Sequence, residues 1–147
     1  MKLSTRGRYG TRAVLELALN EGQGPISLKQ VARNQEISVQ YLEHLITPLI
    51  EGGIIKSTRG AREGISLAKP AENIRVIEIL QLLEGQTSLV DCLEKPETCD
   101  RGDYCSVKDF WNTISFAIDG VLGKINLREL AERQKKKEFS QENMYYI

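Results

Sequence analysis

The sequence has few of the residues on which most enzymes depend. A single histidine, His44, occurs among 147 residues, which is too few for most catalytic or zinc sites built on histidine. No nucleophile has an evident base, no glycine-rich phosphate loop occurs, and no carboxylate pair marks a pocket. We therefore expect that the chain is not an enzyme.

Long apolar runs are also missing. No run reaches the about 18 apolar residues that a membrane-spanning helix needs, and residues 1–11 lack the apolar segment of a signal peptide. These absences predict a cytoplasmic protein with no membrane partner. Cysteine is scarce as well: Cys92, Cys99 and Cys105 are clustered and odd in number, unlike a secreted disulfide scaffold, so thiol or metal thiolate is their expected state.

Charge is divided unevenly along the chain. Residues 1–62 carry nine Lys/Arg against five Asp/Glu, a net +4, and residues 63–147 carry eleven against fifteen, a net −4. A basic first half suits a polyanionic partner such as nucleic acid. The acidic second half suggests a different task, and a protein-interaction module remains an alternative.

The first 84 residues follow the pattern of a winged helix-turn-helix. Apolar spacing predicts a helix over residues 4–19 with Ser4 or Thr5 as its N-cap. Its polar face is formed by Lys2, Arg6, Arg8 and Arg12. Ser27 with Gln30 forms a predicted capping box for a second helix, and Ser38 caps a third after a turn over residues 34–37. The segments IIKST and GISLA, joined by RGARE, predict a two-stranded wing with a basic tip. A further helix is expected over residues 75–84, ended by Gly85.

The second part of the chain is predicted to be a loop and two helices, which makes the fold mainly α. Residues 85–106 carry the cysteines and lack periodicity, so we expect a long loop without regular structure. Residues 107–137 are predicted to hold a long helix with an apolar stripe and then a short helix capped by Asn126; residues 138–147 form a tail. The stripe needs a partner surface, most simply the same helix of a second subunit in a homodimer.

Three segments of the sequence carry a resemblance to a known family. They are MKLSTRGRYGTRAVLELAL, then ISLKQVARNQEISVQYLEHLITPLIEGGIIKSTRG, then the three cysteines. Together they resemble the IscR-like winged-helix regulators, which include NsrR and CymR, over residues 1 to about 130. The resemblance implies a dimeric transcriptional regulator that binds double-stranded DNA at a pseudo-palindromic operator. In several members an iron-sulfur cluster in the cysteine loop controls binding.

The third helix is the predicted recognition helix for the major groove. Gln40 can pair with adenine, and Glu43 can accept from the cytosine amino group. The resemblance matches Glu43 to the family's recognition-helix glutamate, Arg59 to its wing arginine, and the first helix to its phosphate contacts. The DNA-binding candidates are Arg6, Arg8, Tyr9, Lys29, Ser38, Gln40, Tyr41, Glu43, His44, Arg59 and Arg62.

Two positions depart from the family pattern. Glu36 stands in the turn where relatives often have glycine, so we expect either a different turn or modest backbone strain there. Pro48 stands in the second half of the recognition helix, where its missing amide predicts a kink between His44 and Pro48. Base reading uses the first two turns, so DNA binding is expected to survive the kink.

The cysteines follow the pattern C-x6-C-x5-C. Soft thiolates suit an iron-sulfur cluster, and zinc is a rival that lacks its usual tight cysteine pairs. The resemblance implies that Cys92, Cys99 and Cys105 are ligands, with [2Fe-2S] favoured over [4Fe-4S]. Lys108 occupies the place of the fourth ligand of IscR, a histidine, which leaves Asp91, Glu94, Asp103, Asp109 or a group from the partner's first helix as candidates.

The predicted function is therefore a regulator that senses iron-sulfur cluster status and controls cluster-biogenesis or related genes. The alternatives keep the DNA-binding domain and replace the cluster as the control element, as in cysteine-metabolism repressors. Either Cys92 forms a disulfide with Cys99 or Cys105 under oxidation, or a protein partner controls DNA binding. Three idle thiols in a mobile loop remain the simplest alternative for the cysteines.

Overall fold

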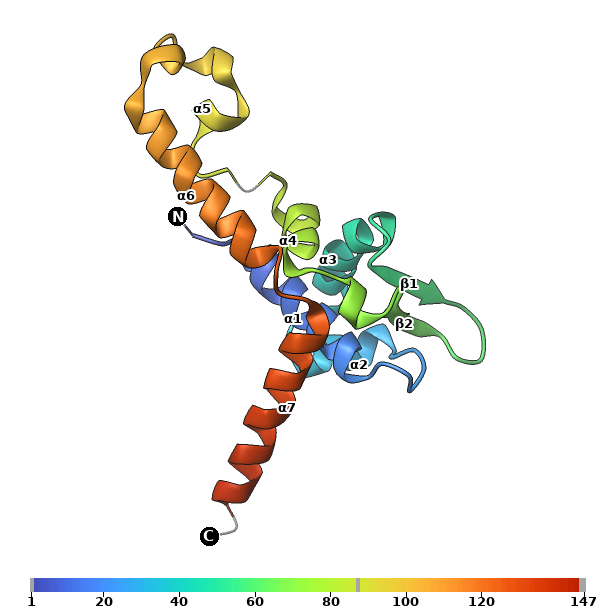
Figure 1. Cartoon of the computed structure of the whole chain (residues 1–147). Coiled ribbons are helices and arrows are strands. Elements are labelled where there is room, and N and C mark those ends of the chain that lie inside the picture. Colours follow the sequence, from blue (N-terminus) through green and yellow to red (C-terminus); the bar gives the residue numbers. More distant parts are fainter. Residues whose placement is uncertain (1, 87, 146–147) are drawn as a thin grey trace.

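The chain folds into a small winged-helix body from which two helices protrude. A computed structural model describes residues 2–86 and 88–145. In Figure 1, α6 extends from the body with the cysteine-bearing segment at its far end, and α7 extends in another direction. The described chain is mainly helical with a two-stranded sheet, which confirms the predicted fold class. Within it, no helix is both long and apolar enough to cross a membrane.

The first three helices form the centre of the body. They are α1 (Thr5–Leu19), α2 (Leu28–Gln35) and α3 (Val39–Glu51). The apolar face of α1 is buried against α3, α2 and α4, and its fully buried side chains include Ala13 and Val14. On its other side, the Glu16 carboxylate accepts from the side-chain amides of Asn34 (2.5 Å) and Gln35 (2.7 Å), which joins α1 to the end of α2.

The predicted N-caps are present. Ser4 Oγ accepts from the amide of Gly7, Ser27 Oγ from that of Gln30, and Ser38 Oγ from that of Tyr41, at 3.3, 3.2 and 3.0 Å. The capping box at Ser27 is only half as predicted, because the Gln30 side chain donates to Asn34 Oδ1 at 2.8 Å. Asn34 lies one turn along α2 and offers an acceptor within easier reach.

Glu36, in the turn between α2 and α3, adopts the left-handed conformation (φ 56°, ψ 42°). It is the one non-glycine residue with positive φ among those the structure describes. A left-handed backbone costs a residue with a Cβ atom roughly 1–2 kcal/mol, so the strain predicted at this turn is accounted for by its geometry.

We expect Glu36→Gly to raise the free energy of unfolding by about 0.5–1 kcal/mol. Relief of the left-handed strain (roughly 1–2 kcal/mol) exceeds the entropy that glycine adds to the unfolded chain (about 0.4–1 kcal/mol). Urea denaturation measures this, with Glu36→Ala as the control because alanine keeps the Cβ atom. Equal stability of the two variants would contradict the assignment.

Helix α3 continues through Pro48 as far as Glu51. Leu49, the next residue, is fully buried, and the hydroxyl of Thr47 donates to the Glu43 carbonyl at 2.7 Å. The side chains around the proline are therefore held by the core and by a local hydrogen bond. The bend expected between His44 and Pro48 stays a prediction.

The wing consists of β1 (Ile55–Thr58) and β2 (Gly64–Leu67), paired antiparallel from Ile55 opposite Leu67 to Thr58 opposite Gly64. The segment before α2 joins this sheet, since Ile26 and Ile65 exchange amide-to-carbonyl hydrogen bonds of 2.9 and 2.8 Å. A Cβ atom on Gly64 would overlap the Ile26 carbonyl. Glycine at this position therefore lets the wing root approach the helices closely.

Helix α4 (Val76–Glu84) follows a short 3-10 turn, η1 (Ala71–Asn73), and packs on α1. At its start, Glu78 Oε2 accepts from the amide of Arg75 at 2.7 Å, and Oε1 contacts Lys69 Nζ at 2.9 Å. Partial burial raises the pKa of Glu78, but the Arg75 hydrogen bond and the Lys69 ammonium lower it more, so the pKa lies below its ordinary value.

The segment between α4 and α6 differs from the expected structureless loop. It contains the short helix α5 (Asp91–Glu94) and the 3-10 turns η2 (Pro96–Thr98) and η3 (Gly102–Tyr104). The long helix α6 (Ser106–Leu122) follows as predicted. The short turns escaped sequence analysis because elements of three or four residues are too short to establish a hydrophobic period.

Helix α7 (Leu127–Met144) is longer and more firmly attached than expected. Asn126 caps it as predicted, by accepting from the amide of Glu129 at 3.0 Å, but the helix continues past residue 137 into the expected tail. Its first turns belong to the core of the winged helix, since Leu127 and Ala131 are buried. The amide of Leu127 also donates to the Ile74 carbonyl at 2.8 Å.

Candidate nucleic-acid interface and cysteine loop

The first two turns of α3 present polar side chains to solvent. Ser38, Gln40, Glu43 and His44 are exposed, whereas Leu42, Leu45 and Ile46 on the opposite side are buried. Ser38 is the N-cap of α3, and its hydroxyl oxygen already accepts a hydrogen bond from the amide of Tyr41. The side of α3 that carries the predicted DNA-binding residues is therefore accessible to a groove of DNA.

An aromatic contact joins α1 to α3. The rings of Tyr9 and Tyr41 meet edge to face, with centroids 6.3 Å apart, and the guanidinium of Arg12 lies over the Tyr9 ring at 5.5 Å from its centroid. Tyr9 and Tyr41 are half-buried. This contact places the polar face of α1, with Arg6 and Arg8 exposed on it, beside the start of the recognition helix.

Arg12 belongs to this surface although sequence analysis left it out of the DNA-binding candidates. It is exposed and follows Arg8 by four residues and Tyr9 by three. This spacing places all three side chains on neighbouring parts of one helix face. The spacing was visible in the sequence, and only the cation–π contact with Tyr9 shows that Arg12 is held there.

The other basic candidates lie on separate elements. Lys29 is exposed in the first turn of α2, and Arg59 and Arg62 are exposed in the turn between β1 and β2. Gly60 in this turn has a φ of 102°, a conformation that glycine adopts without strain. The wing therefore carries its two arginines on a short connection outside the core.

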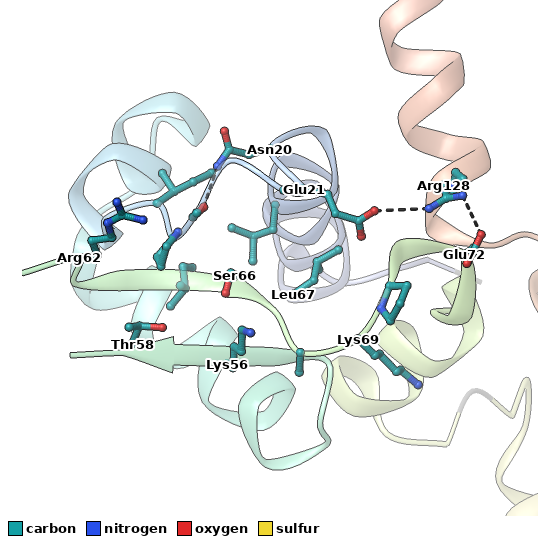
Figure 2. Close-up of a pocket in the computed structure, with 18 residues that line it drawn as sticks. Asn20, Glu21, Lys56, Thr58, Arg62, Ser66, Leu67, Lys69, Glu72 and Arg128 are labelled. Atoms are coloured by element: carbon teal, nitrogen blue, oxygen red, sulfur yellow. Dashed lines mark hydrogen bonds and ion pairs between the residues drawn. The ribbon is translucent and has the colours of Figure 1, made fainter. Parts of the chain in front are cut away.

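An open cleft lies beside the wing, between its strands and the turn that joins α1 to α2 (Figure 2). Lys56, Thr58 and Ser66 line it from the strands. At its other end, Arg128 of α7 contacts Glu72 at 2.7 Å and Glu21 at 3.5 Å (Figure 2). These ion pairs attach the first turn of α7 to the body.

The three cysteines are free thiols that lie on different local elements. Cys92 is in α5 and half-buried, Cys99 follows η2 and is exposed, and Cys105 precedes α6 and is half-buried. Within residues 2–86 and 88–145, no three side chains of His, Cys, Asp or Glu converge as metal ligands. The structure thus places the predicted ligands on one segment without bringing them together.

The donor atoms of this segment suit an iron-sulfur cluster, but their arrangement here does not. Thiolate sulfur is the usual ligand of such clusters, and Cys92, Cys99 and Cys105 would supply three. Lys108, at the position where the resemblance implies a fourth ligand, has its ammonium beside η3, 3.2 Å from where a Cβ atom on Gly102 would stand. In this conformation the segment does not form a complete cluster site.

Helix α6 exposes an apolar face. None of its residues is buried, and Val107, Phe110 and Val121 are more than half exposed. Their spacing, with the exposed Ala117 between them, places them on one side of the helix. A contiguous apolar face of this kind usually marks an interface with another chain.

Comparison with known proteins identifies relatives along almost the whole chain. Residues 3–133 match the family model Rrf2, described as "Iron-dependent Transcriptional regulator". The transcriptional regulator CymR of Bacillus subtilis is 40% identical over 131 residues, which cover 89% of this chain and 90% of that protein.

Solved structures of two kinds of regulator have the same fold. That of T. potens IscR has a TM-score of 0.79 and 36% identity and covers 99% of this chain and 97% of its own. That of the oxidised form of Staphylococcus aureus CymR has a TM-score of 0.73 and 40% identity, with coverages of 90% and 97%.

Proposed function

The chain belongs to the Rrf2 family of transcriptional regulators, and we propose that it is a cytoplasmic homodimer that reads a pseudo-palindromic operator under the control of its cysteine loop, residues 88–105. DNA-binding transcriptional regulation, with no enzymatic activity, follows from the family itself. The site residues, the homodimer and the signal sensed are the parts that we propose.

The exposed first two turns of α3 are the single observation that carries the DNA-reading proposal. Gln40, Glu43 and His44 project from a helix whose opposite side is anchored in the core. Arg6 and Arg8 on α1 and Lys29 on α2 would contact phosphates on either side, and Arg59 and Arg62 would follow the adjacent minor groove or its backbone. The Tyr9–Tyr41 contact supports a fixed spacing between α1 and the recognition helix.

The exposed face of α6 supports the homodimer. The α6 helix of a second subunit would cover Phe110, Ala117 and Val121. Both subunits would use this same surface, as twofold symmetry requires. Two winged helices would then reach successive half-sites of a duplex, which explains why the operator is expected to be a pseudo-palindrome.

For the signal, we propose that Cys92, Cys99 and Cys105 hold an iron-sulfur cluster, with [2Fe-2S] favoured. The three thiols on one segment and the iron-dependent description of the family support this choice. When bound, such a cluster would make the regulator responsive to iron supply or oxidants. Because no three candidate ligands among the described residues are placed to hold a metal ion, cluster binding would require that the cysteine loop rearrange.

A thiol-disulfide switch is the second candidate. All three cysteines are free, and Cys99 is exposed to oxidants. A relative has been crystallised in an oxidised form. In this case oxidation of two thiols would close a disulfide and change the loop in the same place.

Anaerobic incubation with ferrous iron and sulfide separates the two candidates. We expect visible absorption with bound iron and sulfide, at least tenfold less of it in Cys99→Ser, and a changed operator affinity in the loaded protein. Ser106→Ala, an exposed substitution beside Cys105, is the control and should load normally. Protein that never binds iron or sulfide, but forms a disulfide with diamide that mass spectrometry detects, would overturn the cluster and favour the switch.

A further inference from the structure

The last residue of α4, Glu84, holds the amino-terminal turn of α1. One carboxylate oxygen, Oε1, accepts from the amide of Ser4 at 3.1 Å, from the amide of Gly7 at 3.0 Å, and from the hydroxyl of Ser4. Ser4 and Glu84 are half-buried and Gly7 is buried. These donors are the residues at which α1 begins, so Glu84 caps α1 from a distance of 80 residues in sequence.

The negative charge of Glu84 is favourable for α1 and unfavourable for α4, the helix to which Glu84 belongs. A negative charge is unfavourable at the carboxyl end of a helix and favourable at the amino end. Glu84 is the final residue of α4, whereas α1 has no acidic residue in its first turn and carries Arg6 and Arg8 nearby. The carboxylate therefore supplies α1 with the charge that its own first turn lacks.

Two glycines allow this contact. A Cβ atom on Gly7 would overlap Glu84 Oε1, and a Cβ atom on Gly10 would overlap the Leu83 side chain. Both glycines lie inside α1, where glycine is otherwise unfavourable by about 1 kcal/mol relative to alanine. Their presence indicates that close contact between α1 and the end of α4 is what these positions require.

Glu84 lies four residues before the cysteine loop in sequence. Gly85 has a φ of 82° and closes α4 by donating to the Gln81 carbonyl at 3.0 Å. Helix α5, which carries Cys92, lies away from the body beside α6 (Figure 1). Glu84 thus contacts the helix that carries Arg6, Arg8 and Tyr9, and it precedes in sequence the part of the chain that carries the thiols.

We propose that Glu84 is a positioning residue for operator binding: it fixes the first turn of α1 and transmits changes in the cysteine loop to Arg6 and Arg8. The inference rests on the proposed function. It assigns the coupling between the cysteine loop and operator binding to one carboxylate. Removal of this carboxylate is expected to change both the operator affinity and its dependence on the state of the loop.

Glu84→Gln in the full chain tests this, because glutamine has the same shape without the charge. Operator affinity is measured across a range of salt concentrations, for reduced apo-protein and for protein treated anaerobically with ferrous iron and sulfide, or with diamide if no iron binds. We expect the affinity ratio of the two states to fall towards one from the about 5–150-fold typical of coupled sites. The salt dependence should become shallower as phosphate contacts of α1 are lost.

Glu132→Gln is the matched control, since Glu132 is exposed on α7 and loses the same charge. Gly7→Ala is the second variant, because its methyl group would displace the carboxylate while favouring a helix. Glutamine keeps a carbonyl acceptor but loses the charge, so faster hydrogen exchange at the residue-7 amide in Glu84→Gln verifies that the cap is weakened in a folded protein. An unchanged ratio and salt slope, or tighter binding, in Glu84→Gln would overturn the proposal. No difference between the two states in the unmodified protein would refute loop control instead, and the salt slope would still test the positioning role.

Discussion

Ala117→Glu in α6 is expected to make the protein monomeric and to lower its operator affinity by about 10²–10⁴-fold, the usual gain from linking two binding events. Ala117 lies between Phe110 and Val121 on the exposed apolar face. In the proposed dimer this face is covered, so each subunit would bury an unpaired carboxylate, at a cost of several kcal/mol. Because Ala117 is exposed in the single chain, the fold itself should be preserved.

Sedimentation velocity measures the oligomeric state, and fluorescence anisotropy with labelled operator measures the affinity. Asn112→Glu is the control, because Asn112 is exposed and lies half a turn away from the apolar face of α6. It should remain dimeric and bind normally. A dimeric Ala117→Glu protein with unchanged affinity would place the interface elsewhere.

Glu43→Ala is expected to remove discrimination at one base pair of each half-site, by about 1–3 kcal/mol per half-site. Glu43 is exposed in the second turn of α3, and a carboxylate there accepts from cytosine while it is repelled by acceptor-rich base edges and by phosphate. Its loss should therefore relax specificity and increase affinity for unrelated DNA.

Selection of binding sites from a random DNA pool measures this directly. The sites selected by Glu43→Ala should match those of the unmodified protein except at one symmetric pair of positions, where base preference disappears. Glu51→Ala is the control, since Glu51 is exposed at the far end of the same helix and loses the same charge. Identical preferences in Glu43→Ala and the unmodified protein would exclude Glu43 as a base-reading residue.

The winged helix was predictable because its signals are local. Ser4, Ser27 and Ser38 cap the helices that their positions indicate, and the two strands of the wing flank a turn rich in glycine and charge. Such signals depend on neighbours three or four residues apart, which a sequence displays. The strain at Glu36 was predicted from the resemblance, because relatives often have glycine at this position and few other residues adopt a left-handed conformation.

The features that sequence analysis missed depend on contacts between distant residues. The attachment of α7 to the core through Leu127 and Arg128 joins segments more than fifty residues apart, and Glu84 reaches back to Ser4 across the whole winged helix. The guanidinium of Arg12 is held by its cation–π contact with the ring of Tyr9. The sequence shows that the three cysteines lie on one segment, but whether their thiols come together depends on how that segment folds.

The central claim is that two copies of α3 meet successive grooves of one duplex. Hydroxyl-radical footprinting on a selected operator, with the number of bound chains measured by native mass spectrometry, tests it most directly. We expect two chains per duplex and two symmetric protected segments about 34–36 Å apart. A single chain on one asymmetric protected segment would contradict it.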